Sequence, residues 1–281
     1  MVGKRILSLD TSVINQLTDE PHGALVARIR AGYYARVPFL AASEIIACRD
    51  SARRKLLIGT CNKLTRSGEI VTAHHDILRV FVRRYEHGLP ISPAKSLHLR
   101  FLEAEDGLRR DDFDDITDQE RQENYNNGEI FKGVYANVKP LFDRLRAEGQ
   151  PMPRSAGQLL AALDQGETLR DMMRGLYERA AIKRADDAAI RAFSDGCEPF
   201  RALIAALVVA QFDRCVKEDG QPSMKTGRND TFMATYLPLC DEFVTDDGGQ
   251  LACFREVVSL AGLNVDVRSY QDFRKTLLLA A

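Results

Sequence analysis

The chain has 281 residues, of which 45% are hydrophobic and 28% are charged, values typical of a folded protein with a real core. Its formal net charge of −1 argues against a surface that coats nucleic acid non-specifically, although it leaves room for a local basic patch. The length suits one large domain, or one domain that carries a sizeable insertion.

The longest apolar run, Ala202 to Ala210, is about half of the ~20 residues that a membrane-spanning helix needs, so no membrane partner is expected. The six cysteines are widely scattered, without the close pairs of a zinc site. This scatter fits buried thiols in a reducing compartment. The first residues lead into a strand without a signal-peptide pattern. We therefore expect a cytoplasmic protein.

Short apolar runs bounded by polar or turn residues predict strands, and the amphipathic segments between them predict helices. The predicted strands are Arg5–Leu9, Val37–Leu40, Glu69–Thr72, Glu242–Thr245 and Asn264–Arg268. The predicted helices cover residues 24–32, 44–58, 77–82, 200–216, 231–237 and 251–260, and Ser43 is expected to cap the second of them. Strands that alternate with helices predict an α/β fold.

The character of the chain changes between residues 88 and 199. Strand-like runs vanish there, and helical segments rich in Leu, Arg, Asp and Glu, punctuated by prolines, take their place. We therefore predict an α/β domain formed by residues 1–87 and 200–281, interrupted by a mainly helical insertion at 88–199. The insertion's role in substrate selection or dimer contacts stays open.

Four acidic positions stand at or near the ends of predicted strands. They are Asp10, Glu44, Asp230 and the pair Asp246 and Asp247. Taken singly, each acid could simply cap a helix or form a turn. In a parallel sheet, however, these positions converge at one edge, where unpaired carboxylates repel one another. A divalent cation that prefers oxygen ligands, Mg²⁺ or Mn²⁺, would remove that repulsion.

The order and spacing of these short motifs resemble the PIN-domain nucleases. The matching segments are Leu9-Asp10-Thr11-Ser12-Val13-Ile14, Ala42-Ser43-Glu44-Ile45, Asn229-Asp230 with Ala234-Thr235, and Phe243-Val244-Thr245-Asp246-Asp247. The resemblance covers about residues 1–85 and 200–270. It implies a three-layer α/β/α fold around a five-stranded parallel sheet, and hydrolysis of phosphodiester bonds, usually in RNA, with a divalent metal.

The resemblance also implies a role for each matching residue. Asp10, Glu44, Asp230 and Asp247 take the positions of the catalytic, metal-binding acids, while Asp246 falls on a variable position of the last motif and is the alternative ligand. Ser12 and Thr245 match the small polar residues that support the acids. The glycines Gly248 and Gly249 depart from the charged residue that often follows the last acid. Lys225 and Arg228 are candidates for contacts to substrate phosphates, or for a merely solvated loop.

Two other functions are weighed against a ribonuclease, and a toxin role is considered within it. A phosphatase of the haloacid-dehalogenase type also begins with a strand and an Asp, but its second Asp is replaced here by Ser12. A catalytically inactive PIN-like module would bind RNA or a protein without cutting. Small PIN proteins often act as toxins, which would add an antitoxin, or a second copy of the chain, as a partner of this longer protein.

Overall fold

A computed structural model of the chain describes residues 4–110, 113, 116–122, 139–140, 142–165, 167–217 and 228–279. Its centre is a five-stranded sheet in the order β3-β2-β1-β4-β5, in which every neighbouring pair is parallel. The strands are β1 (Arg5–Leu9), β2 (Tyr33–Pro38), β3 (Glu69–Val71), β4 (Glu242–Thr245) and β5 (Asp266–Ser269). The predicted α/β class with a five-stranded parallel sheet is therefore confirmed.

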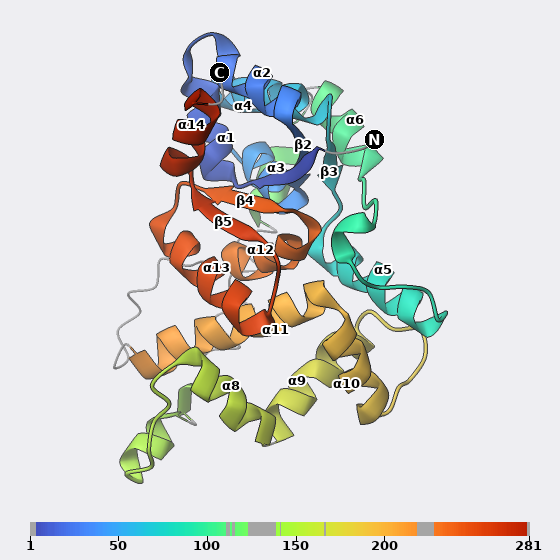
Figure 1. The fold of residues 1–281 in the computed structure, drawn as a ribbon, viewed down its shortest axis with the longest axis vertical. Helices are drawn as coiled ribbons and strands as arrows, with labels where there is room; N and C mark the ends of the chain where they lie inside the picture. The colour runs from blue at the N-terminus through green and yellow to red at the C-terminus, as the bar shows by residue number, and fades with distance from the viewer. Residues whose placement is uncertain are drawn as a thin grey trace.

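Helices cover both faces of this sheet (Figure 1). One face carries α1 (Thr11–Asp19), α2 (Ala24–Gly32), α4 (Ser51–Thr65) and α14 (Tyr270–Leu279). The other carries α13 (Gly248–Ala261) and the 3₁₀ helix η4 (Ala234–Leu239), against which α11 (Glu198–Gln211) packs together with α5 (His74–Glu86). Two helical layers around one sheet form the three-layer α/β/α arrangement.

The second strand and the helix after it differ from the sequence prediction. β2 begins at Tyr33 and ends at Pro38, whereas the prediction placed a strand over 37–40. Aromatic residues favour strands, and Pro38 stands directly before α3 (Phe39–Ile46) as its N-cap. The single helix predicted over 44–58 is therefore two helices, α3 and α4. Ser43 lies within α3, so its predicted capping role was wrong, and Glu44 follows it in the same helix.

Within residues 88–199, the described part of the chain contains helices and no strand longer than a single bridge. They include η2 (Ala94–Ser96), α6 (Leu102–Arg110), α8 (Ala156–Gln165), α9 (Glu167–Glu178) and α10 (Asp187–Gly196). In Figure 1, α8, α9 and α10 lie beyond α11, on the side away from the sheet. Their buried side chains join the same hydrophobic core as the sheet, for example through the edge contact between Phe193 and Phe200.

The start of the 88–199 segment also covers the outer edge of β3. The backbone N–H of Phe101 donates to the Ile70 carbonyl at 2.8 Å, and the N–H of Ile70 donates to the buried Glu105 carboxylate at 3.1 Å. An uncovered edge strand offers unpaired backbone groups to other chains. These two bonds satisfy such groups on β3, so this part of the segment completes the sheet. The division at residue 88 stays a prediction.

A buried ion pair joins β2 to β3. Its arginine also binds η2 and the end of η4, directly before β4. The guanidinium of Arg36 donates from Nε to Glu69 Oε1 at 2.7 Å, and both residues are almost fully buried. Its remaining nitrogens donate to the backbone carbonyls of Lys95, Leu97 and Leu239. A charge taken out of water is tolerated only when it is paired and hydrogen-bonded in this way. Arg36 therefore fixes η2 and the entry to β4 against the sheet.

Replacing Arg36 with alanine should lower the free energy of unfolding by about 3–5 kcal/mol, because it leaves the Glu69 carboxylate buried without its partner. Urea denaturation followed by circular dichroism measures this loss. Lys275→Ala, which removes an exposed lysine 3.8 Å from Asp272, is the control and should shift the midpoint far less. An Arg36→Ala midpoint close to that of the control would contradict the assigned role.

The described cysteines are free thiols, and most of them are buried. Burial raises the pKa of Cys61 to about 12 and that of Cys197 to about 12. Cys48, after α3, is only half-buried. Because the thiolate is the reactive form, the buried thiols should be inert in the folded protein.

Treatment with iodoacetamide at pH 8 should therefore modify Cys48 and leave Cys61 and Cys197 intact until denaturant is added. Peptide mapping by mass spectrometry distinguishes these sites. Rapid modification of Cys61 in the native protein, at the rate measured in denaturant, would show that α4 does not pack as described.

Candidate functional site

The C-terminal ends of β1 and β4 lie side by side in the middle of the sheet. Between these two strands, the chain changes the side on which it adds further strands. β1 pairs with β4 through Leu7↔Glu242 and Leu9↔Val244, yet the chain after β1 leads to β2 on one side and the chain after β4 leads to β5 on the other. In open α/β sheets, such a switch point leaves a crevice that commonly holds the ligand. The first and last predicted acids directly follow these two strands.

Asp10 is held firmly at this switch point. Its side chain is only 6% exposed, and it caps the N-terminus of α1. Its Oδ2 accepts hydrogen bonds from the Ser12 N–H at 3.3 Å, the Ser12 Oγ at 2.7 Å and the Thr245 Oγ1 at 3.3 Å. No group in the described part of the chain donates to Oδ1. One carboxylate oxygen is thus fixed, and the other keeps its lone pairs for another partner.

Two hydroxyl groups connect the ends of β1 and β4. Thr245 Oγ1, fully buried, donates to Asp10 and accepts the Asp247 N–H at 3.1 Å. Ser12 Oγ likewise donates to Asp10 and accepts the Asp246 N–H at 3.0 Å. These hydrogen bonds give a physical basis for the supporting roles predicted for Ser12 and Thr245. Each hydroxyl orients Asp10 and also accepts a backbone N–H from Asp246 or Asp247.

Asp246 and Asp247 are both exposed and differ in what they bind. Asp247 caps α13, its Oδ1 accepting the Gln250 N–H at 2.8 Å. Asp246 Oδ2 accepts from Gln16 Nε2 at 2.8 Å. The capping alternative weighed from the sequence is thus realised for Asp10 and Asp247, but each cap uses one carboxylate oxygen and leaves the second for another ligand.

Glu44 reaches the same edge from α3. Its Oε2 accepts a hydrogen bond of 2.5 Å from the Thr11 hydroxyl, and Thr11 is the residue after Asp10. The half-buried carboxylate of Glu44 therefore lies beside the first turn of α1. This contact brings the second predicted acid to the segment that carries the first.

Asp230 lies in α12 (Arg228–Met233), but its side chain and that of Arg228 are not described, and Lys225 lies outside the described residues. The segment that carries Asp230 is held near the end of β3. Phe232 stacks on His74, the first residue of α5, with ring centroids 4.3 Å apart. The Tyr236 hydroxyl, in η4, donates to the carbonyl of Thr72, which follows β3. The α12 backbone thus belongs to the same edge of the sheet.

The chemistry of the donor set fits a hard divalent cation, because the acids offer carboxylate oxygens and the Asp10 Oδ1 receives no hydrogen bond from described residues. The side chains that are described nevertheless contain no group of three or more Asp, Glu, His or Cys residues arranged to hold a metal. The Asp230 side chain is not among them. The structure thus brings Asp10, Glu44, Asp246 and Asp247 to the C-terminal ends of the central strands, a place called the acidic edge. These residues do not form a complete ligand set among the side chains that the structure describes.

Two contacts at this edge were not predicted from the sequence. Thr11 fixes Glu44, and Gln16 fixes Asp246. Both residues are on α1. Thr11 directly follows Asp10, and Gln16 is four residues after Ser12 and therefore lies on the same side of the helix as Ser12. The signal that could have found them is the start of α1 at Thr11, because residues in the first turns of that helix lie close to its capping Asp10.

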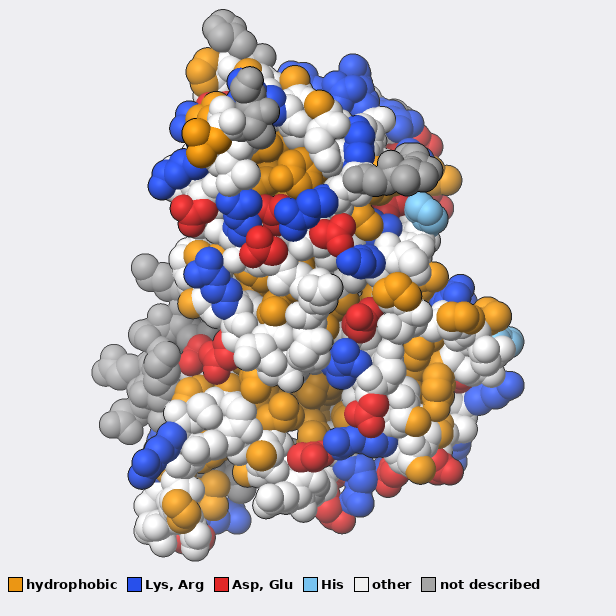
Figure 2. Space-filling model, in the orientation of Figure 1, with side chains coloured by type: hydrophobic (Ala, Val, Ile, Leu, Met, Phe, Trp, Pro, Cys, Tyr) orange, Lys and Arg blue, Asp and Glu red, His pale blue; other side chains and the backbone are white. Residues whose placement is uncertain are grey.

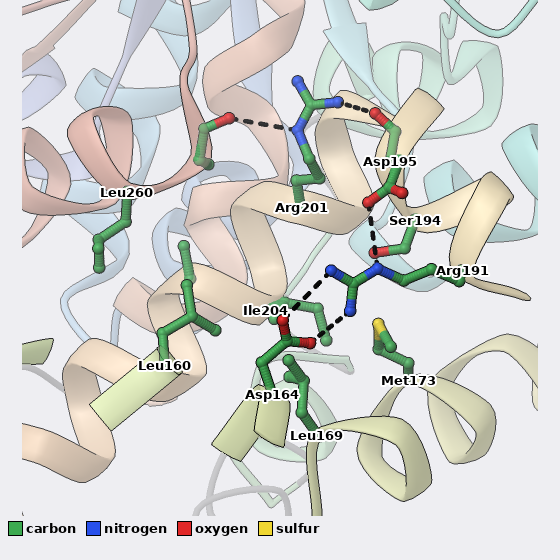
Figure 3. Close-up of a pocket in the computed structure, with 12 residues that line it drawn as sticks. Leu160, Asp164, Leu169, Met173, Arg191, Ser194, Asp195, Arg201, Ile204 and Leu260 are labelled. Carbon is green, nitrogen blue, oxygen red and sulfur yellow. Dashed lines mark hydrogen bonds and ion pairs between the residues drawn. The ribbon is translucent and has the colours of Figure 1, made fainter. Parts of the chain in front are cut away.

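A separate cavity of about 140 Å³ lies between α8, α9, α10, α11 and the C-terminal end of α13 (Figure 3). It is lined by apolar side chains such as Leu160, Met173 and Leu260, and its Arg191 is paired with Asp164. Because α13 begins at the candidate site and rises ~1.5 Å per residue, its far end lies roughly 20 Å away. This cavity is therefore not part of the acidic edge.

Comparisons of this chain with models of protein families, with curated proteins and with solved structures found no match. Among the helices described, none combines the length and the apolar character needed to cross a membrane. The assignment of a function therefore depends on the geometry of the acidic edge and on the chemistry of its residues.

Thr245→Val keeps the shape of the side chain but removes the hydroxyl that orients Asp10 and holds the Asp247 N–H. We expect the free energy of unfolding to fall by about 1–2 kcal/mol, the usual effect of losing a buried hydrogen-bonding group. Thr245→Ser, which keeps the hydroxyl, is the matched control in urea denaturation. Equal stability of the valine variant and the wild type would show that the two strand ends do not depend on this hydroxyl.

Proposed function

We propose that this protein is a divalent-metal-dependent nuclease, with RNA as its substrate. The observation that carries the proposal is the buried Asp10 carboxylate at the switch point of the sheet, which the described residues hold through Oδ2. Such an acid, joined at the same edge by Glu44 and by Asp246 and Asp247, suits the binding of Mg²⁺ or Mn²⁺. The resemblance to PIN-domain nucleases assigns the same acids to the same chemistry.

In this proposal Asp10, Asp230 and Asp247 would hold the principal metal, and Glu44 would assist it or a second metal. A bound metal would supply an activated water and stabilise the charge on the phosphate and on the leaving oxygen. The protein's own side chains prepare the acids for this. Ser12 and Thr245 fix the orientation of Asp10, and Thr11 holds Glu44 at the first turn of α1, so both carboxylates are oriented by neighbouring groups before a cation binds.

Single-stranded RNA is the proposed substrate class because the resemblance implies it. Figure 2 shows Lys and Arg interspersed with Asp and Glu over the visible face, without one large basic field. A substrate would therefore be held by a few phosphate contacts near the acids, for which Lys225 and Arg228 are the candidates next to Asp230. An antitoxin is a further proposed partner that follows from the same family likeness, and a second copy of the chain is proposed as a partner of the 88–199 segment.

A second candidate function is a PIN-like module that binds RNA or a protein without cutting. The observations that favour it are that Asp10 and Asp247 both serve as helix caps, and that the described side chains form no metal-holding group of three. The two functions differ in whether the acidic edge binds a divalent cation. Titration with Mn²⁺ in a calorimeter near neutral pH distinguishes them, since an inactive module would release no heat of metal binding.

Asp10→Asn should abolish Mg²⁺- or Mn²⁺-dependent cleavage while leaving the fold intact, because the amide removes the charge but keeps the size of the side chain. The assay incubates labelled single-stranded RNA and, in parallel, single-stranded DNA with Mn²⁺ or with chelator. Asp266 is an exposed acid at the N-terminal end of β5, the end of the strands away from the acidic edge. Asp266→Asn is therefore the matched control and should cleave like the wild type. Cleavage by Asp10→Asn at the wild-type rate would refute the proposal.

A further inference from the structure

The helical residues 116–122, from the middle of the 88–199 segment, contact the helix that carries Glu44. Thr117 is buried. Its Oγ1 donates to the Phe113 carbonyl at 2.6 Å and also lies 3.1 Å from the carbonyl oxygen of Ile46, the last residue of α3. Phe113, just before this short helix, is also buried in the common core. The segment is therefore packed against α3 and does not merely pass over it.

A second contact lies three residues earlier in α3. The hydroxyl of Ser43, which is 5% exposed, donates to Glu120 Oε2 at 2.7 Å. A serine inside a helix commonly donates to the carbonyl four residues before it. Here the hydroxyl donates instead to a residue outside its own helix, a carboxylate 77 residues away in the sequence. A buried hydroxyl that loses such a partner costs free energy, so the contact holds the two segments together.

These contacts bracket Glu44 on α3, one at the residue before it and the other two residues after it. On its other side, Glu44 accepts the hydrogen bond from Thr11, the neighbour of Asp10. A continuous set of contacts thus connects Glu120, through the backbone of α3, with the acidic edge. A shift of α3 along its axis would break the Ser43–Glu120 hydrogen bond and disturb the packing of Thr117 against the Ile46 carbonyl.

We propose that the 88–199 segment sets the position of Glu44 and thereby the activity of the acidic site, with Glu120 and Thr117 as positioning residues. This inference rests on the nuclease function proposed above. Neither residue needs to touch the substrate. Groups that hold a ligating side chain in place commonly change metal affinity or activity by about 10–100-fold when removed, and we expect a loss of that order here.

The test compares Glu120→Ala, Glu120→Gln and Ser43→Ala with the wild type in cleavage of labelled single-stranded RNA over a range of Mn²⁺ concentrations. Glu120→Ala should lower kcat or raise the Mn²⁺ concentration for half-maximal rate by about 10–100-fold, with KM for RNA little changed. Glu120→Gln keeps an oxygen that accepts from Ser43 and should restore most of the activity. The double variant Ser43→Ala with Glu120→Ala should be no worse than Glu120→Ala alone, since both remove one contact.

Glu103→Ala, an exposed acid on α6, controls for a general loss of charge in this segment, and thermal unfolding of each variant controls for loss of fold. If the wild type cleaves and Glu120→Ala cleaves with the same kcat and Mn²⁺ dependence, the positioning role is wrong while the nuclease function stands. If Glu120→Gln is as impaired as Glu120→Ala, the hydrogen bond does not explain the effect and the inference also fails. If the wild type shows no metal-dependent cleavage at all, the proposed function fails, and the inference falls with it.

Discussion

The pairing of β1 with β4 is the constraint on which the acidic edge depends. It brings together Asp10 and Thr245, which are 235 residues apart in the sequence. Because the two strands are parallel and in register, both end at the same level, and short side chains suffice to connect them. A slip of the register by one residue would turn Leu9 and Val244 toward the opposite faces and separate the hydroxyls from the carboxylate. The site is thus a consequence of strand pairing more than of any single loop.

The acidic edge and the Arg36–Glu69 pair show two ways in which this protein places charge out of water. Arg36 and Glu69 neutralise one another, and the backbone carbonyls around them complete the hydrogen bonding. Asp10, which is almost as buried, receives neutral donors at Oδ2 from the residues that the structure describes, and none of these residues donates to its Oδ1. The first arrangement is closed and serves the fold, whereas the second suits the proposed binding of a cation. This difference separates a structural charge from a candidate functional one.

Much of the fold could be predicted from local patterns, and the failures have physical causes. Glu242–Thr245 was placed correctly because a short apolar run stands between clear turn residues. The second strand was misplaced because Pro38 was taken as its beginning, although a proline can equally end a strand before a helix. The contacts of Thr11 with Glu44 and of Ser43 with Glu120 could not be predicted, since they depend on how whole helices pack. The acids and two of their supporting hydroxyls, Ser12 and Thr245, could be named from the sequence, but not the contacts of Thr11 and Gln16.

The distance along the chain between the two halves of the site has a consequence for synthesis. While the chain is being made, β1, β2 and β3 are complete long before β4 appears, so the edge of β1 that will pair with β4 is open meanwhile. At roughly 5–20 residues per second, Thr245 emerges on the order of ten to fifty seconds after Asp10. Until then Asp10 keeps the Ser12 hydroxyl but lacks that of Thr245 and the acids that follow β4. A nascent chain of this topology therefore stays without its complete acidic site until β4 has left the ribosome.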